Sequence, residues 1–233
     1  MLYKELAFAR RLKFSLMSMK TEKQEISETL LLLRILQKDD NIDGNLKLQK
    51  EVFLTEQNLL RSQLGVLCYK YFRYTWGPYS KELAEKFKSL AERGFVHKTT
   101  YTLTERGIYL LEFVDGILRD YRHNSKIFEI VDSTVAKYKR YSGPQLTNIV
   151  YNTEVEAHDS PGKELKVKDI PVFTDIFVPE DFEHMAGLEF PPALLDALKA
   201  ELSMDKETWE SLPEKKQNAL RRAKKQLLAA IAN

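Results

Sequence analysis

The feature that most constrains the fold is a short stretch, YKYFRYTWGPYSKELAEKF, over residues 69–87. Five of its first eight residues are aromatic, and the dipeptide Gly77-Pro78 follows them directly. Aromatic and β-branched residues favour a pleated strand, so VLCYKYFRY (66–74) is predicted to be a strand. Gly77-Pro78 interrupts it, and Ser80 is a suitable N-cap for a new helix. The stretch therefore predicts a strand, a hard turn and a helix in immediate succession.

Helix signals lie on both sides of this stretch. Thr21 and Gln24 fit a capping box ahead of an apolar helical pattern, and LKLQKEVFLTEQNLL (46–60) reads as a second helix. The elements predicted after Ser80 are a helix over 81–93 that Gly94 ends, a short β-hairpin over 95–104, a helix over 105–122 capped by Thr104, a helix over 125–141, and a short helix that begins near Pro144.

The order helix, helix, strand, helix, hairpin, helix is that of a winged helix-turn-helix. We therefore expect a mainly α fold with a small β-hairpin wing (α+β) and a helical C-terminal extension. Residues 153–189 hold ten acidic residues against three lysines, which marks a change of character. The expected organisation is an N-terminal extension (1–20), a winged-helix-like domain (21–152), an acidic linker or segment (153–189) and a C-terminal helical extension (190–233). Met1 and Met19 both remain possible starts.

Four motifs carry a resemblance to known families: KLQKEVFL, YFRYTWGPYSKEL, LAERGFV and YTLTERG. Together they resemble small winged-helix proteins of the YwgA-like type and, more loosely, the SocA-like antitoxin family with its Panacea domain. In both, a KLQK helix, here residues 47–50, precedes an aromatic segment that ends in Gly-Pro. The resemblance covers residues 25–155, and the YSKEL and YTLTERG motifs suit the winged-helix type better. It implies regulation or binding without a cofactor.

Several classes of function find no support in the sequence. The chain has no nucleophile elbow, P-loop, dinucleotide fingerprint or zincin motif, so we expect a protein that is not an enzyme and has no cofactor. The single cysteine, Cys68, reads as a small buried apolar residue, and with no disulfide partner it suggests a cytoplasmic setting. No apolar run is long enough for a membrane span. His158 and His184 lie among acids, but no ligand spacing indicates a metal site.

Local charge carries the DNA-binding hypothesis, because the formal net charge is only +2. Residues 70–98 hold seven Lys or Arg against three acids, around the helix that would enter the major groove. The candidate DNA contacts are Arg73, Lys81, Lys88, His97 and Lys98, with Gly77, Pro78 and Ser80 as the structural turn and cap. Against this, Glu82, Glu85 and Glu92 form an acidic ridge on the solvent side of the helix, as in an ordinary charged surface.

Two partner classes follow. The first is double-stranded DNA, bound by a transcription regulator. A homodimer is expected in that case, because winged helices often read paired half-sites. The second is a protein, such as a toxin that an antitoxin-type module neutralises through the acidic 153–189 segment or the glutamate ridge. The aromatic residues of 69–76 read either as core or as a stacking platform. The basic residues of 215–225 read either as a DNA or partner contact or as a helix docked on the acidic segment.

Overall fold

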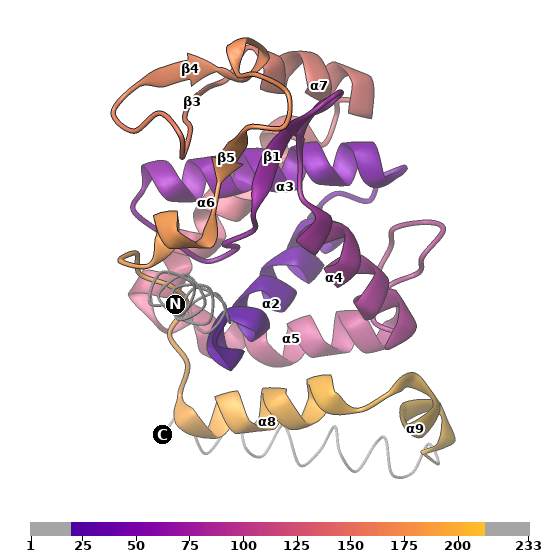
Figure 1. Cartoon of the computed structure of the whole chain (residues 1–233). Coiled ribbons are helices and arrows are strands. Elements are labelled where there is room, and N and C mark those ends of the chain that lie inside the picture. The colour runs from indigo at the N-terminus through magenta and orange to yellow at the C-terminus, as the bar shows by residue number, and fades with distance from the viewer. Residues whose placement is uncertain (1–19, 213–233) are drawn as a thin grey trace, which may run out of the picture.

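The computed structural model describes residues 20–212, which form a mainly helical fold with two small antiparallel sheets (Figure 1). The N-terminal extension up to residue 19 and the basic residues of 215–225 lie outside the described residues. The helices are α2 (Glu22–Lys38), α3 (Asn45–Arg61), α4 (Lys81–Glu92), α5 (Glu105–Arg119), α6 (Arg122–Tyr138), α7 (Gly143–Tyr151), α8 (Pro192–Ser203) and α9 (Lys206–Ser211). The strands are β1 (Tyr71–Tyr74), β2 (Gly77–Tyr79), β3 (Glu154–Glu156), β4 (Glu164–Lys166) and β5 (Asp175–Phe177).

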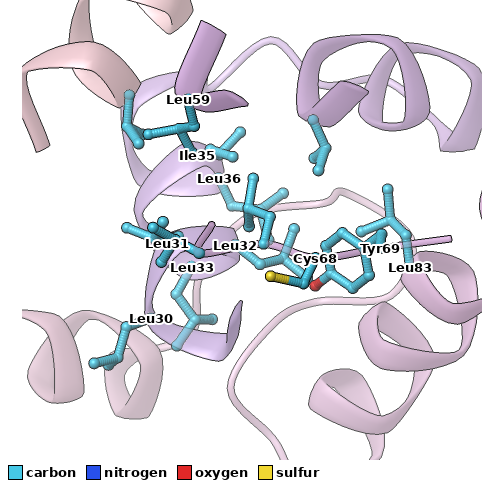
Figure 2. Close-up of a cluster of buried hydrophobic side chains, with 14 of the residues drawn as sticks. Leu30, Leu31, Leu32, Leu33, Ile35, Leu36, Leu59, Cys68, Tyr69 and Leu83 are labelled. Atoms are coloured by element: carbon cyan, nitrogen blue, oxygen red, sulfur yellow. The ribbon is translucent and has the colours of Figure 1, made fainter. Parts of the chain in front are cut away.

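Helix α2 is the centre of the core. Every residue from Ile26 to Leu36 is buried, because α5, α6 and α8 all contact the helix. Figure 2 shows its leucines packed among Leu59, Cys68, Tyr69 and Leu83. Ile26, Leu30 and Leu33 lie in the core as the apolar pattern predicts. The polar residues between them, such as Glu28 and Arg34, are buried as well, because neighbouring elements enclose the helix.

The predicted helix caps are confirmed. Thr21 and Gln24 form the capping box of α2, with Gln24 N donating to Thr21 Oγ1 at 3.2 Å. Ser80 Oγ accepts from Leu83 N at 3.1 Å at the start of α4, and Thr104 Oγ1 accepts from Gly107 N at 3.2 Å at the start of α5. Each cap satisfies a backbone N–H that the helix itself leaves without a partner.

The aromatic segment differs from its prediction in a specific way. Only 71–74 form a strand, and the chain reverses at Thr75-Trp76 rather than at Gly77-Pro78. Gly77 and Pro78 belong to β2, which pairs antiparallel with β1 so that Tyr74 faces Gly77. Gly77 has φ of +90°, a backbone conformation that glycine adopts without steric cost.

The predicted wing is also smaller than expected. Residues 95–104 form a loop held by a single β-bridge between Val96 and Leu103, with a backbone hydrogen bond from His97 N to Thr102 O of 2.8 Å. The strand expected to pair with this hairpin, β1, instead pairs with β2 on one side and with β5 on the other. The sheet order is therefore β2-β1-β5.

The acidic segment 153–189 packs on the helical part of the chain. It contributes β5 to the main sheet and the separate β3–β4 hairpin. Its apolar residues, among them Val167, Ile176 and Phe182, belong to the same buried cluster as the leucines of α2. Burial of these residues explains how a segment rich in acids holds a fixed place in the fold.

Helices α8 and α9 lie on the side of the molecule opposite the β3–β4 hairpin (Figure 1). Arg106, which is 4% exposed, donates to the carbonyls of Glu201 and Met204 at 3.0 Å each. Lys199 at the surface pairs with Glu22 of α2 at 2.7 Å. Within residues 20–212, no helix combines the length and the apolar character that crossing a membrane requires.

Candidate functional site

The KLQK motif joins α3 to the β1–β2 hairpin. Gln49 is 1% exposed, and its side-chain amide both donates to Ser80 O and accepts from Ser80 N, each at 2.8 Å. This pair of bonds fixes the residue that caps α4. The position of α4 and the position of the hairpin are therefore set by the same buried side chain.

Lys50 reinforces this junction. Its Nζ donates to the carbonyl of Pro78 at 2.7 Å inside the fold. Burial lowers the pKa of Lys50 to about 7, and the positive charge of Arg73 acts in the same direction. KLQK and GPYS thus meet in space, which explains why a chain with this fold needs both stretches. One sequence feature is consistent with this contact: KLQK places long polar residues between the apolar positions of a helix.

Lys47, the first residue of the motif, is also buried but binds different segments of the chain. Its ammonium group lies 2.7 Å from Asp39 Oδ2 and donates to the carbonyls of Asn41 and Lys139. Burial and, after it, the nearby Asp39 together raise the pKa of the neighbouring Glu51 to about 9. Lys47 therefore compensates the buried carboxylate of Asp39 and ties α3 to the loop before it.

The outer face of the β2-β1-β5 sheet is covered with aromatic rings. Phe72 lies 5.7 Å from Tyr79 between ring centroids, and Tyr74 lies 5.9 Å from both Tyr79 and Phe173. Five large apolar residues are exposed among those described, and four of them lie at this end of the sheet. The four are Tyr74, Trp76, Val172 and Phe173. We call the residues Phe72, Tyr74, Trp76, Tyr79, Val172 and Phe173 the aromatic face.

Strand alternation decides which aromatic residues reach this face. Tyr71 points inward and is fully buried, while the exposed fraction of Tyr74 is 43% and that of Trp76 in the turn is 65%. The interpretation of the aromatic segment as core is therefore confirmed for part of it only. Tyr69 and Tyr71 belong to the core, and the outward residues form a surface.

Phe173 is presented to solvent by a strained backbone. Its φ is +70°, a left-handed conformation that costs a non-glycine residue about 1–2 kcal/mol, and its side chain is 73% exposed. Two hydrogen bonds hold this loop on β1: Phe173 N donates to Arg73 O, and Arg73 N donates to Thr174 O. Backbone strain that holds an apolar ring in water favours a functional role for the exposed ring.

Both edges of the sheet are occupied by the chain itself. On the β2 edge, Lys50 and Gln49 bind the backbone at Pro78 and Ser80. On the β5 edge, Ile176 O accepts from His158 N at 3.0 Å. A partner therefore meets this sheet through its face, and addition of a strand to an edge is disfavoured.

The five predicted DNA contacts fall into three groups. Arg73 is 8% exposed, donates to Val167 O at 3.1 Å and stacks on Tyr151, so its predicted role as a phosphate contact is corrected to a structural one. Lys81 and Lys88 are exposed on α4, but each pairs with the glutamate four residues later, Glu85 and Glu92, at 3.4 and 3.7 Å.

His97 and Lys98 form the third group. Both are exposed on the 95–104 loop, beyond the end of α4. Gly77, Pro78 and Ser80, predicted as structural, are all buried at the hairpin junction. The structure thus separates the predicted set into buried residues that build the fold and exposed residues on α4 and the loop.

His158 lies in a different place, at a cavity of about 360 Å³ beside the β3–β4 hairpin. Its Nδ1 is 2.9 Å from Asp181 Oδ1, and this hydrogen bond raises the pKa of His158. Within residues 20–212, no group of three or more His, Cys, Asp or Glu has the arrangement of a metal site.

No family model, no curated protein and no solved structure matches the chain. The candidate site therefore rests on the contacts of this chain alone.

Proposed function

We propose that this protein is a non-catalytic protein-binding module whose aromatic face receives a neutral, apolar surface of its partner. The supporting observation is that four of the five large exposed apolar residues of the described chain lie at one end of the sheet, with Phe173 held there at a cost in backbone strain. Exposed apolar groups that are concentrated in this way mark interaction sites. The resemblance to SocA-like antitoxins makes a toxin the expected class of partner.

The charges beside the aromatic face favour a protein partner over a single-stranded nucleic acid. Stacking of bases on aromatic rings is accompanied by basic residues that follow the phosphates. Next to Phe72, however, Lys70 is paired with Asp175 at 2.8 Å, and Arg73 points into the fold. A surface of aromatic rings with paired charges at its side fits the apolar core of a protein–protein interface.

Replacing two outward residues of the aromatic face tests this function. We expect the double variant Trp76→Ser, Phe173→Asn to lose a stoichiometric partner that tagged wild-type chain retains from its native cells. Loss of such interface anchors lowers affinity at least about thirtyfold. Asparagine is chosen because it tolerates the left-handed backbone at position 173.

The matched control is Ile108→Ser, which changes the fifth exposed apolar residue, on α5. This variant should retain the partner as the wild type does. Retention of the partner by the double variant, or recovery of no partner by the wild type, contradicts the proposal.

Regulation by duplex DNA, within a winged-helix type of fold and with a possible homodimer, is the second candidate. Exposure of His97 and Lys98 on the 95–104 loop favours it. We expect affinity for duplex DNA that falls steeply as salt rises, and Lys98→Ala should reduce the slope by about 1. Lys23→Ala, an exposed lysine of α2, is the control. Absence of duplex binding at low salt in an electrophoretic or fluorescence assay excludes this candidate.

A further inference from the structure

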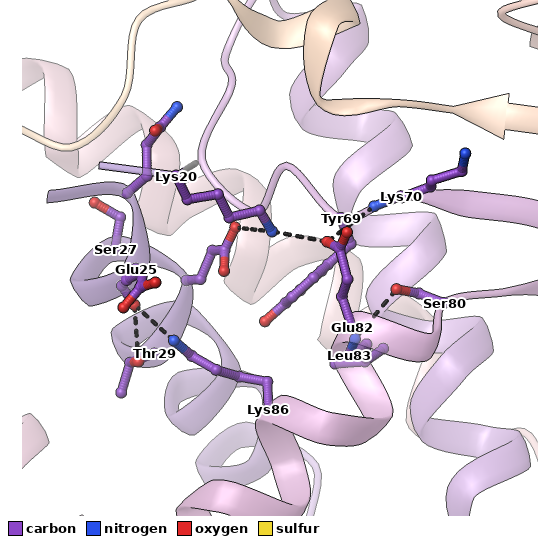
Figure 3. Close-up of polar contacts among 12 residues, drawn as sticks. Lys20, Glu25, Ser27, Thr29, Tyr69, Lys70, Ser80, Glu82, Leu83 and Lys86 are labelled. Carbon is purple, nitrogen blue, oxygen red and sulfur yellow. Dashed lines mark hydrogen bonds and ion pairs between the residues drawn. The ribbon is translucent and has the colours of Figure 1, made fainter. Parts of the chain in front are cut away.

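Just before α2, the ammonium group of Lys20 lies between side chains from three separate parts of the fold (Figure 3). Its Nζ is 2.6 Å from Glu28 Oε1 on α2 and 3.0 Å from Glu82 Oε2 on α4. It also lies 4.8 Å from the centroid of the Tyr69 ring, in the segment before β1. Two carboxylates and the face of an aromatic ring are the groups that recognise a cation.

Glu28, the carboxylate on one side of Lys20, is buried deeply enough to require a cation. The Glu28 side chain is 3% exposed, and burial raises its pKa to about 7 even though Lys20 opposes the shift. For Lys20, burial lowers the pKa, but the two carboxylates outweigh this and raise it overall. A buried carboxylate that loses its cation is left uncompensated, so a positive charge at this point stabilises the fold.

The site is also reachable from outside. A cavity of about 530 Å³ adjoins it, with Lys20, Glu28, Tyr69 and Glu82 in its wall. The side chain of Glu82 is 41% exposed, so one of the two carboxylates already faces solvent. The other cations of the wall are Lys86, which donates to the carbonyl of Glu25 at 3.1 Å, and Arg93, which donates to the carbonyl of Leu202 at 3.0 Å. Each therefore has a partner of its own.

We propose that Glu28, Glu82 and the ring of Tyr69 form a binding site for a primary alkylammonium group, the end group of a lysine side chain, and that Lys20 is its resident occupant. A primary ammonium carries three N–H donors, which match two carboxylates and leave its charge over the ring. A tetramethylammonium ion has the charge without the donors. While Lys20 is in place, it holds the start of α2 against α4; when Lys20 is absent, an external ammonium group takes its position.

Thermal unfolding of full-length Lys20→Ala tests the site. We expect a lower Tm than for Lys23→Ala, the exposed lysine three residues away, because Lys20, at 2.6 Å from the Glu28 carboxylate, is the lysine that pairs with it directly. At matched ionic strength, n-butylammonium should raise the Tm of Lys20→Ala by about 2–4 °C, as a ligand of the folded state does. Tetramethylammonium should not, and neither wild type nor Lys23→Ala should respond to n-butylammonium. An equal response of all three proteins, or an equal effect of both ions, overturns the proposal.

If Lys20→Ala does not fold, a measurement on the wild-type chain tests the proposal instead. Acetylation with an activated ester, followed by mass spectrometry, should modify Lys20 several-fold more slowly than Lys23. The variant Glu82→Gln removes the carboxylate on the exposed side of the site. It should speed the acetylation of Lys20 but not that of Lys23. Equal rates at Lys20 and Lys23 in the wild type overturn the assignment of Lys20 as the occupant.

Discussion

Replacing Gly107 with alanine should destabilise the protein by about 3 kcal/mol or more, at the upper end of the cost of overpacking. Gly107 lies in the first turn of α5, where an added Cβ would be 2.2 Å from the carbonyl oxygen of Phe95. No heavy atoms approach so closely, and the obstacle is backbone, which no side-chain rotation removes. The 95–104 loop would have to move away from α5, and with it His97 and Lys98.

Gly116 provides a matched control in the same helix. It is exposed, and an added Cβ there has no neighbour within 4 Å. Gly116→Ala should therefore stabilise the protein by about 0.5–1 kcal/mol, since alanine favours a helix over glycine. Chemical denaturation of both variants measures the difference. Equal stability of Gly107→Ala and Gly116→Ala would show that α5 and the 95–104 loop are not packed in this way.

Lys47→Met should reduce the free energy of unfolding by about 3–5 kcal/mol, the usual cost of breaking a buried ion pair from one side. Lys47 is 2% exposed and Asp39 is fully buried, and they are 2.7 Å apart. Methionine keeps the length of the apolar stem but removes the ammonium group from the Asp39 carboxylate and from the carbonyls of Asn41 and Lys139. Urea denaturation near neutral pH measures the loss.

A double-mutant cycle separates this pair from general damage to α3. In the variant Lys47→Met, Asp39→Asn, no buried charge is left uncompensated at this pair, so the total loss should be smaller than the sum of the two single losses. Lys23→Met, at an exposed position of α2, should change stability by less than about 0.5 kcal/mol. Additive losses in the cycle would refute the coupling between Lys47 and Asp39.

Local chemistry made part of the fold predictable. Thr21, Ser80 and Thr104 were expected as helix caps, and each accepts the expected backbone N–H. A cap depends on a side chain and on residues two or three positions later, so the information lies within one turn of chain. The mainly helical class followed in the same way, from periodic apolar residues between capped starts and glycine or proline ends.

The candidate site was less predictable, because its parts come from distant segments. Arg73 was expected at the surface, but Val167 and Tyr151 enclose it from segments far along the chain. The sequence did not indicate Phe173 as a site residue, because no neighbouring residue shows that its loop is bound to β1 with a left-handed backbone. One sequence feature did indicate an exposed aromatic surface. Residues 69–76 hold more aromatic residues than the inward face of one short strand can bury.

By itself, the sequence determined the caps, the mainly helical class and the concentration of aromatic residues before Gly77-Pro78, because each depends on residues that are neighbours along the chain. Only the tertiary structure decided that β5 pairs with β1, that KLQK binds the hairpin at Pro78 and Ser80, and that Tyr74 and Phe173 share one exposed face. These outcomes depend on which distant segments compete for the same backbone groups and the same buried space. Pairing of that kind is settled by the free energy of the whole fold, and no local pattern encodes it.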